Sequence, residues 1–231
     1  WVYYDRNGDK VTDKWAKSGN NWYYLDSNGE MAVDQLIEDG DNYYYVDVNG
    51  VMAANQWVAI DNEDAGDDDE PEHYWYYFQA NGKALKQGDS DTVSLKTVNG
   101  KKYAFDEYGA MVAEWSLDED DEKKASDTEA QEAASTASTS EAWEGNGKYA
   151  KYTQAWKYYN CVEDGSRVSK GWFKVVPAEM LNKEKYDDDE ESWYYADGSG
   201  NLYAGEFKTI KGKKYAFRND GRMLTGLKFI K

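Results

Sequence analysis

Aromatic and polar positions alternate along this chain in a way that predicts short β-strands. In the segment WYYLDSNGEM, residues 22–31, a run of aromatic side chains is followed by a leucine and a polar turn with a glycine. Successive side chains of a strand point to opposite faces, so Trp22 and Tyr24 would share one face and Tyr23 would lie on the other. Aromatic runs bounded by Asn, Asp and Gly are typical of hairpin strands. The Asn-Gly and Asp-Gly pairs of these turns are expected to adopt positive φ.

A unit of this kind recurs along the whole chain. Its turn glycine is found at Gly8, Gly29, Gly50, Gly82, Gly109, Gly165, Gly200 and Gly221. Three of the intervals, 8–29, 29–50 and 200–221, are 21 residues long, and a fixed period in this range marks a repeat architecture. Because an isolated hairpin is only marginally stable in water, successive hairpins must stack. We therefore predict an all-β fold, a solenoid of stacked β-hairpins with repeats of about 21 residues.

Long acidic insertions interrupt the repeats. The longest, residues 118–141, is rich in Asp, Glu, Ala, Ser and Thr. Asp118 could cap one short helix over its first part, and the rest is typical of a loop. We expect hairpin repeats over residues 1–117, the insertion over 118–145 and hairpin repeats again over 146–231. One continuous repeat domain is preferred, and a two-lobed arrangement is the alternative. The chain starts and ends within a repeat, as expected of a piece of a longer protein.

Composition and charge narrow the classes of partner. The 231 residues include 10 Trp and 21 Tyr but only 2 Pro, and 45 acidic residues against 27 basic ones give a net charge of -18. Nucleic acids and anionic membranes are bound through Lys and Arg, so this balance disfavours them. It favours a cationic ligand, or serves solubility. No run of 18 apolar residues is present, so we predict no membrane span.

The sequence gives little support for catalysis. His73 is the single histidine and Cys161 the single cysteine, so no Ser-His-Asp set, no Cys-x-x-Cys pair and no intramolecular disulfide is expected. We predict a chain that is not an enzyme and needs no cofactor. The acidic runs at 67–70 and 187–191 offer carboxylate oxygens for calcium but lack the spaced pattern of a calcium loop. A further hypothesis is that they attract a cationic ligand to nearby aromatic residues.

The surplus of aromatic residues suggests binding sites between hairpins. Trp15 and Trp22 would lie on adjacent strands of one hairpin, with Tyr45 contributed by the next. The stacked interior would take Tyr23 and Tyr44. Three aromatic faces around a small space can hold a quaternary ammonium by cation–π attraction. Sugar rings also stack on Trp and Tyr, and plain packing between hairpins is a third explanation.

Methionine recurs two residues after several turn glycines. Met31 and Met52 follow Gly29 and Gly50 in this way. A methionine side chain adapts to irregular apolar surfaces. We therefore expect these residues to floor the grooves between hairpins.

The repeat W-x₃-G-x₂-WYYLDSNGEM, residues 15–31, resembles the choline-binding repeat of Gram-positive surface proteins. It belongs to a wider group of cell-wall-binding repeats that includes glucan-binding repeats and the repetitive oligopeptides of clostridial toxins. The resemblance implies a hairpin solenoid that is secreted and binds phosphocholine on teichoic acids at the cell wall. It also implies a targeting part of a larger enzyme or adhesin. Glucan or host glycan is the alternative ligand of the same fold.

Carried onto this sequence, the resemblance implies three ligand sites. Their residues are Trp15, Trp22 and Tyr45 with Met31 or Met52, then Trp57, Trp75 and Phe105, and finally Trp172, Trp193 and Phe217. Two other units have Lys102 and Lys214 at the position of Trp22, where a lysine would repel choline. Their KKYAF segments resemble the toxin-like and glucan-like branch of the group. A spacer whose cages are vestigial is the remaining alternative.

Overall fold

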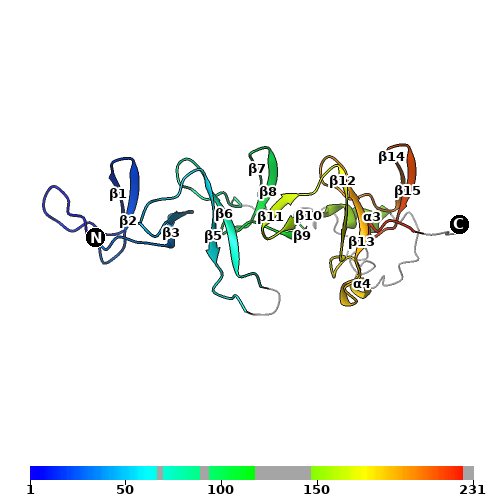
Figure 1. The fold of residues 1–231 in the computed structure, drawn as a ribbon, viewed down its shortest axis with the longest axis horizontal. Helices are drawn as coiled ribbons and strands as arrows, with labels where there is room; N and C mark the ends of the chain where they lie inside the picture. Colours follow the sequence, from blue (N-terminus) through cyan, green and yellow to red (C-terminus); the bar gives the residue numbers. More distant parts are fainter. Residues whose placement is uncertain (67–69, 89–93, 118–146, 226–231) are drawn as a thin grey trace. The chain divides into compact units, whose positions relative to one another are not determined.

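The computed structural model describes residues 1–66, 70–88, 94–117 and 147–225. Almost all of its regular structure is short antiparallel strands (Figure 1). The strands are β1 (Lys14–Ser18), β2 (Asn21–Leu25), β3 (Gln35–Asp39), β4 (Asn42–Val46), β5 (Gln56–Asp61), β6 (His73–Phe78), β7 (Ser94–Val98), β8 (Lys101–Phe105), β9 (Glu114–Leu117), β10 (Trp156–Cys161), β11 (Asp164–Arg167), β12 (Gly171–Val175), β13 (Ser192–Ala196), β14 (Glu206–Ile210) and β15 (Lys213–Phe217). The described helices are α3 (Gly147–Ala155) and α4 (Lys183–Asp187).

Consecutive strands pair as hairpins. Six two-stranded sheets are described, β1–β2, β3–β4, β5–β6, β7–β8, β12–β13 and β14–β15, together with one three-stranded sheet of order β11–β10–β9. Within each part of the chain the face of one hairpin packs against the next. The predicted all-β fold of stacked hairpins is therefore confirmed.

Contacts divide the chain into two units. The first comprises residues 1–88 with 105–111, and the second comprises 89–104 with 112–231. Strand β9 pairs with β10, so the residues between Leu117 and Trp156 join two paired strands. The helix predicted within residues 118–141 lies outside the described residues.

An aspartate organises the turn of several repeats. Asp26 accepts hydrogen bonds through Oδ1 from the amides of Asn28 and Glu30, both over 2.8 Å. Gly29 adopts φ 71°, where a Cβ would be strained, whereas Asn28 does not have positive φ. Only the glycine of the predicted pair therefore needs the left-handed region. The same bonds recur at Asp5, Asp47, Asp106 and Asp197.

A second left-handed residue precedes the opening strand of several repeats. Asp13 and Asp34 both have φ 48°, and each lies immediately before the first strand of its hairpin. Their amides donate to the carbonyls of Asp26 and Asp47, over 3.1 and 2.9 Å. Asn and Asp tolerate this conformation better than other residues that carry a side chain. The bond ties the start of each hairpin to the turn that follows it.

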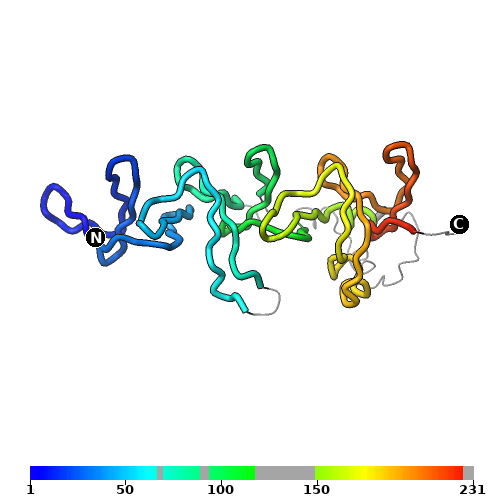
Figure 2. Tube along the Cα trace, viewed as in Figure 1, coloured from blue at the N-terminus to red at the C-terminus, as the bar shows by residue number. Residues whose placement is uncertain are grey.

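The amide two residues after the turn glycine bonds to the preceding hairpin. Met52 donates to the carbonyl of Trp22 over 2.9 Å, and Met111 donates to the carbonyl of Trp75 over 2.8 Å. In the second unit Met223 donates to the carbonyl of Trp193 over 2.8 Å. Figure 2 follows the first unit through successive hairpins, from blue to cyan. The recurrent methionines therefore sit at the joint that sets the spacing of the stack.

In the hairpins β1–β2, β3–β4 and β5–β6 the most buried residue is the one that follows the three aromatic residues of the second strand. Leu25, Val46 and Phe78 are 3%, 0% and 0% exposed. We expected the middle tyrosines, Tyr23 and Tyr44, to fill this interior. Both are only partly buried, and Leu25 and Val46 take the fully buried positions instead. Alternation places the last residue of each second strand on the same face as the middle tyrosine but closer to the joint with the next repeat.

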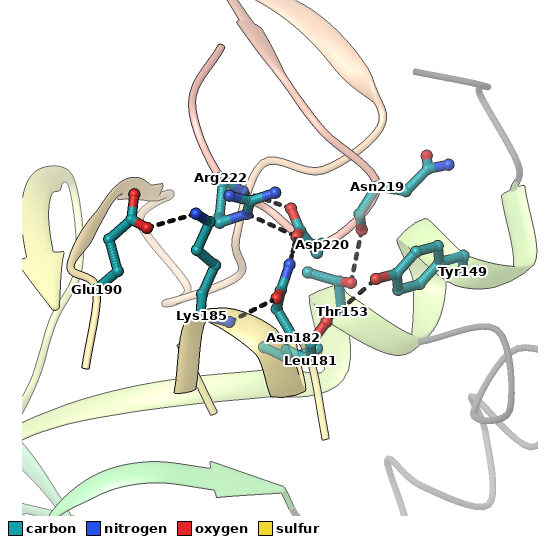
Figure 3. Close-up of polar contacts among 9 residues, drawn as sticks. All are labelled: Tyr149, Thr153, Leu181, Asn182, Lys185, Glu190, Asn219, Asp220 and Arg222. Atoms are coloured by element: carbon teal, nitrogen blue, oxygen red, sulfur yellow. Dashed lines mark hydrogen bonds and ion pairs between the residues drawn. The ribbon is translucent and has the colours of Figure 1, made fainter. Parts of the chain in front are cut away.

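In the second unit, a buried polar network fixes the inserted segments to the last repeat (Figure 3). The Asp220 carboxylate accepts from Asn182 Nδ2 over 2.9 Å and from Arg222 Nε over 2.7 Å. Thr153 of α3 donates its hydroxyl to the Asn219 carbonyl over 2.6 Å. Asn182 also caps α4, because its side-chain oxygen accepts from the amide of Lys185. The network joins α3, α4 and the turn after β15.

We predict that Asp220→Ala destabilises the protein by about 3–5 kcal/mol, because it leaves the Arg222 guanidinium buried without its counter-charge. The free energy of unfolding, from denaturant titration followed by tryptophan fluorescence, measures the loss. Lys183→Ala is the control: its pairs with Glu179 and Asp187 are exposed, and little change is expected. A loss below about 1 kcal/mol for Asp220→Ala would contradict the assigned role.

Candidate functional site

We call the aromatic surface around the indole of Trp15, between the hairpins β1–β2 and β3–β4, the first groove, and name the equivalent surfaces around Trp57 and Trp172 the second and third grooves. Trp15 pairs with Tyr24 across the β1–β2 hairpin and Lys17 pairs with Trp22, so these four side chains share one face. The Trp15 ring lies 5.1 Å from the Tyr24 ring and 5.0 Å from the ring of Tyr44 in the next hairpin. Trp22 remains 40% exposed on the same face. Its aromatic surface is therefore accessible beside a packed aromatic cluster.

Tyr44, rather than the expected Tyr45, faces Trp15. Tyr45 pairs with Leu36 on the other face of the β3–β4 hairpin, where its ring lies 6.1 Å from that of Phe78. Its hydroxyl donates to Asp34. Neighbouring residues of a strand cannot point into the same groove, so we replace Tyr45 by Tyr44 in this candidate site.

Carboxylates lie at the edge of the first groove. The indole Nε1 of Trp15 donates to Asp39 Oδ2 over 3.1 Å. Burial, followed by the charges of Asp13 and Asp39, raises the pKa of Tyr24. Burial and then the charge of Asp39 raise the pKa of Tyr44. The groove therefore combines aromatic faces with negative potential.

The two predicted methionines belong to successive joints. Met52 bonds through its amide to Trp22, the exposed aromatic residue of the first groove. Met31 bonds in the same way to the carbonyl of Trp1. It also lines an open cavity of about 420 Å³ together with Trp1 and Tyr3. Met31 thus lies one joint before Met52.

The second groove contains Trp57 and the predicted Phe105. Their rings stack with centroids 5.9 Å apart at an interplanar angle of 24°, and Tyr77 lies 5.2 Å from Trp57 across the hairpin. Trp75 pairs with Ala59, so it shares the face of Trp57. Phe105 is 0% exposed. The structure therefore places Phe105 as a packed wall of this groove.

The third groove brings all three of its predicted residues together. The Trp172 ring lies 6.4 Å from that of Trp193 and 5.8 Å from that of Phe217, and Trp193 is 42% exposed. Tyr215 of the next hairpin lies closer still, 4.8 Å from Trp172. Tyr215 corresponds to Tyr44 of the first groove and was missed because the sequence alone did not say which face turns toward the preceding hairpin.

A fourth tryptophan pair was not predicted. Trp115 pairs with Tyr158 across β9 and β10, and its ring lies 6.4 Å from that of Trp156. Tyr152 of α3 packs against Trp156 at 6.3 Å, and the Trp115 indole donates to the Val176 carbonyl over 2.8 Å. Both tryptophans pack against a buried cluster here. The Trp-x-Tyr-Tyr motif at 156–159, which repeats residues 1–4, was the available signal.

Lys102 and Lys214, which stand at the position of Trp22 in their repeats, each contact a residue of their own hairpin. Lys214 Nζ lies 5.0 Å from the centre of the Phe207 ring, and Lys102 Nζ lies 3.4 Å from Thr97 Oγ1. A cation of the chain therefore already occupies the aromatic face of the last hairpin.

The acidic run at 187–191 is held by lysines of the same unit. Asp187 pairs with Lys183 at 3.0 Å, Glu191 pairs with Lys174 at 2.8 Å, and Glu190 pairs with Lys185. The other run lies largely at 67–69, outside the described residues. Within the described ranges, no group of three or more His, Cys, Asp or Glu residues is arranged to hold a metal. Neither described helix is long and apolar enough to cross a bilayer.

The first 57 residues of the chain are similar to a known repeat family. The family model of the choline-binding repeat matches residues 1–35 and 11–57. No curated protein matches the sequence significantly.

Two solved structures illustrate the likeness of fold. The modular autolysin LytC from Streptococcus pneumoniae, in complex with a synthetic peptidoglycan ligand, is 18% identical with a TM-score of 0.53, covering 96% of this chain and 37% of that chain. Choline binding protein F from Streptococcus pneumoniae, in the presence of a peptidoglycan analogue, is 22% identical with a TM-score of 0.54, covering 94% and 48%. At these identities the likeness establishes the fold. This chain spans less than half the length of either solved chain.

Tyrosine ionisation is expected to weaken the stack in alkali. Burial, followed by the hydrogen bond to Asp34, raises the pKa of Tyr45 to about 12, against about 10 in an unfolded chain. The protonated form is favoured in the folded state, so this stabilisation is complete below pH 10 and is lost as pH rises from about 10 to about 12. In Tyr45→Phe, the free energy of unfolding should fall less between about pH 9 and about pH 12. An identical fall in both proteins would contradict this.

Proposed function

We propose that this chain, which carries choline-binding repeats, is a non-catalytic cell-wall-binding module that holds choline in the aromatic grooves between its hairpins. It would anchor a larger surface protein or enzyme to phosphocholine on teichoic acids of a Gram-positive wall. Its site of action would be outside the cell, at the cell surface.

One observation carries the proposal: a packed indole lies beside an exposed indole on the same hairpin face. Trp15 is held between the rings of Tyr24 and Tyr44, and Trp22 offers its exposed face beside them. A trimethylammonium group fits such a surface because its diffuse charge is attracted to the negative faces of the rings. Packing alone does not require a large exposed aromatic residue at this position.

Several weak grooves would act together. A cation–π contact contributes about 0.5–2 kcal/mol, so one groove holds choline weakly. The exposed tryptophans of the first and third grooves, Trp22 and Trp193, occupy equivalent positions of their hairpins. Teichoic acids carry many copies of the ligand, and simultaneous engagement of two or three grooves would raise the overall affinity by avidity.

Carbohydrate is the second candidate ligand. Trp193 of the third groove is 42% exposed, and the partly buried rings of Tyr195 and Tyr203 stack at 9° in the same region. Accessible aromatic faces of this kind suit the apolar faces of sugar rings. A glucan would use the same grooves without needing a counter-charge.

We predict that the protein binds a quaternary-amine resin and is eluted by free choline but not by the same concentration of sodium chloride. Because the chain is strongly acidic, the salt control separates choline recognition from anion exchange. Trp22→Ala should remove one choline site from a calorimetric titration, and Trp22→Ala combined with Trp75→Ala and Trp193→Ala should abolish retention. Tyr186→Ala, which removes an exposed aromatic residue from α4, is the matched control.

Three outcomes separate the alternatives. Retention with choline-specific elution supports the choline module. Binding to dextran beads without retention on the amine resin would replace choline by glucan. Retention that survives the triple tryptophan variant in a folded protein would contradict the use of the grooves for either ligand.

We further predict that Tyr44→Ala weakens choline binding at the first groove more than Tyr45→Ala does. Tyr44 contacts Trp15, whereas Tyr45 lies on the opposite face of the hairpin. Because either change could loosen the stack, thermal unfolding of both variants is measured alongside the calorimetric titration. A larger binding loss in Tyr45→Ala at equal stability would reverse the assignment.

A further inference from the structure

The first groove contains a carboxylate bonded to its central indole. Asp39 is the last residue of β3 and pairs with Asn42, on the hairpin face that also carries Ile37 and Tyr44. That face packs against Trp15, and Asp39 Oδ2 accepts the indole N–H over 3.1 Å. Asp39 is exposed, so its carboxylate is accessible to a ligand that approaches the Trp15 indole.

The third groove has an apolar residue in the corresponding place. Ile210 is the last residue of β14 and pairs with Lys213, as Asp39 pairs with Asn42. It shares a face with Tyr215, which contacts Trp172, and it is 8% exposed. The two grooves therefore have equivalent aromatic walls, but the carboxylate bonded to the central indole of the first is absent from the third, where Lys208 takes the place of Ile37 on the same face.

We propose that Asp39 is the specificity-determining residue of the first groove, supplying the negative charge that makes this groove select a small organic cation over an uncharged ligand of the same shape. The inference rests on the proposed function, because it assigns the ligand class of one of the same grooves. The third groove, with Ile210 in place of Asp39, is the site without this selection.

A lysine of the chain already uses the aromatic surface of the first groove as a cation would. Lys17 pairs with Trp22 across the hairpin, and its ammonium lies 5.8 Å from the centre of the indole ring. An incoming quaternary ammonium must share or displace this position. In the third groove the equivalent Lys174 is instead paired with Glu191 at 2.8 Å. Lys17→Gln is therefore expected to raise the affinity of the first groove for choline.

Holding the Trp15 ring in place is the alternative role for Asp39. Asp39→Asn separates the two roles, because the amide oxygen still accepts the indole hydrogen bond while the charge is lost. Asp41→Asn is the matched control: Asp41 lies in the same turn, is exposed, and its change alters the net charge by the same amount. General electrostatic attraction would be reduced equally in both variants.

The experiment compares choline with its uncharged carbon isostere, 3,3-dimethyl-1-butanol, in ¹H–¹⁵N spectra of the indole groups. The signal of Trp15 is assigned from the spectrum of Trp15→Phe, and that of Trp172 from Trp172→Phe. The unsubstituted protein should bind choline at Trp15 more tightly than the isostere. In Asp39→Asn the choline dissociation constant at Trp15 should rise by about three- to tenfold, with no change for the isostere. Binding at Trp172 should not change.

The outcomes distinguish the role of Asp39 from the proposed binding of choline by the grooves. A preference for choline at Trp15 that persists in Asp39→Asn, or an equal loss in Asp41→Asn, would overturn the role of Asp39 and leave the proposed function standing. If choline shifts no indole signal in the unsubstituted protein, the proposed function fails and the selectivity fails with it. If Asp39→Asn shifts the Trp15 indole signal of the ligand-free protein but leaves the preference for choline unchanged, Asp39 holds the ring and does not select the ligand.

Discussion

One backbone hydrogen bond recurs between successive hairpins of this fold. The amide two residues after the turn glycine reaches back to the carbonyl of the first triplet residue in the preceding hairpin, as Met52 does to Trp22. A two-stranded hairpin cannot bury enough surface alone, so its stability depends on this joint and on the apolar residue beside it, such as Val46. The joint also fixes the distance between neighbouring hairpins. The width of the aromatic grooves follows from that distance.

The grooves form because each hairpin presents different residues on its two faces. One face carries the opening and triplet tryptophans, and the other carries the middle tyrosine, so stacking brings Trp15 against Tyr44 and Trp172 against Tyr215. Within this common frame, single positions vary in charge. Asp39 gives the first groove a carboxylate where the third has an isoleucine. Under the proposed function, one scaffold would carry sites of unequal selectivity.

The insertions add structure as well as length. Helix α3 follows the long insertion and packs Tyr152 against Trp156, which closes the fourth tryptophan pair into the core. The segment containing α4 is tied to the last repeat by the buried bonds of Asn182 and Asp220. A pair of tryptophans at repeat spacing is thus not sufficient for an open groove, because an inserted element can occupy it.

The sequence by itself determined the hairpin, the repeat and which residues share a face, because these depend on period-2 alternation, turn chemistry and a fixed spacing of glycines. It also predicted that the two tryptophans of a hairpin, such as Trp15 and Trp22 or Trp172 and Trp193, share one face. Only the tertiary structure decided that Tyr44 rather than Tyr45 meets Trp15, and that Trp156 packs against helix α3 and a buried cluster while Trp22 stays exposed. Alternation assigns a residue to one of two faces, but which face meets which neighbour depends on the joint between repeats. That joint is a contact between segments distant in the chain, so the local sequence pattern does not predict it.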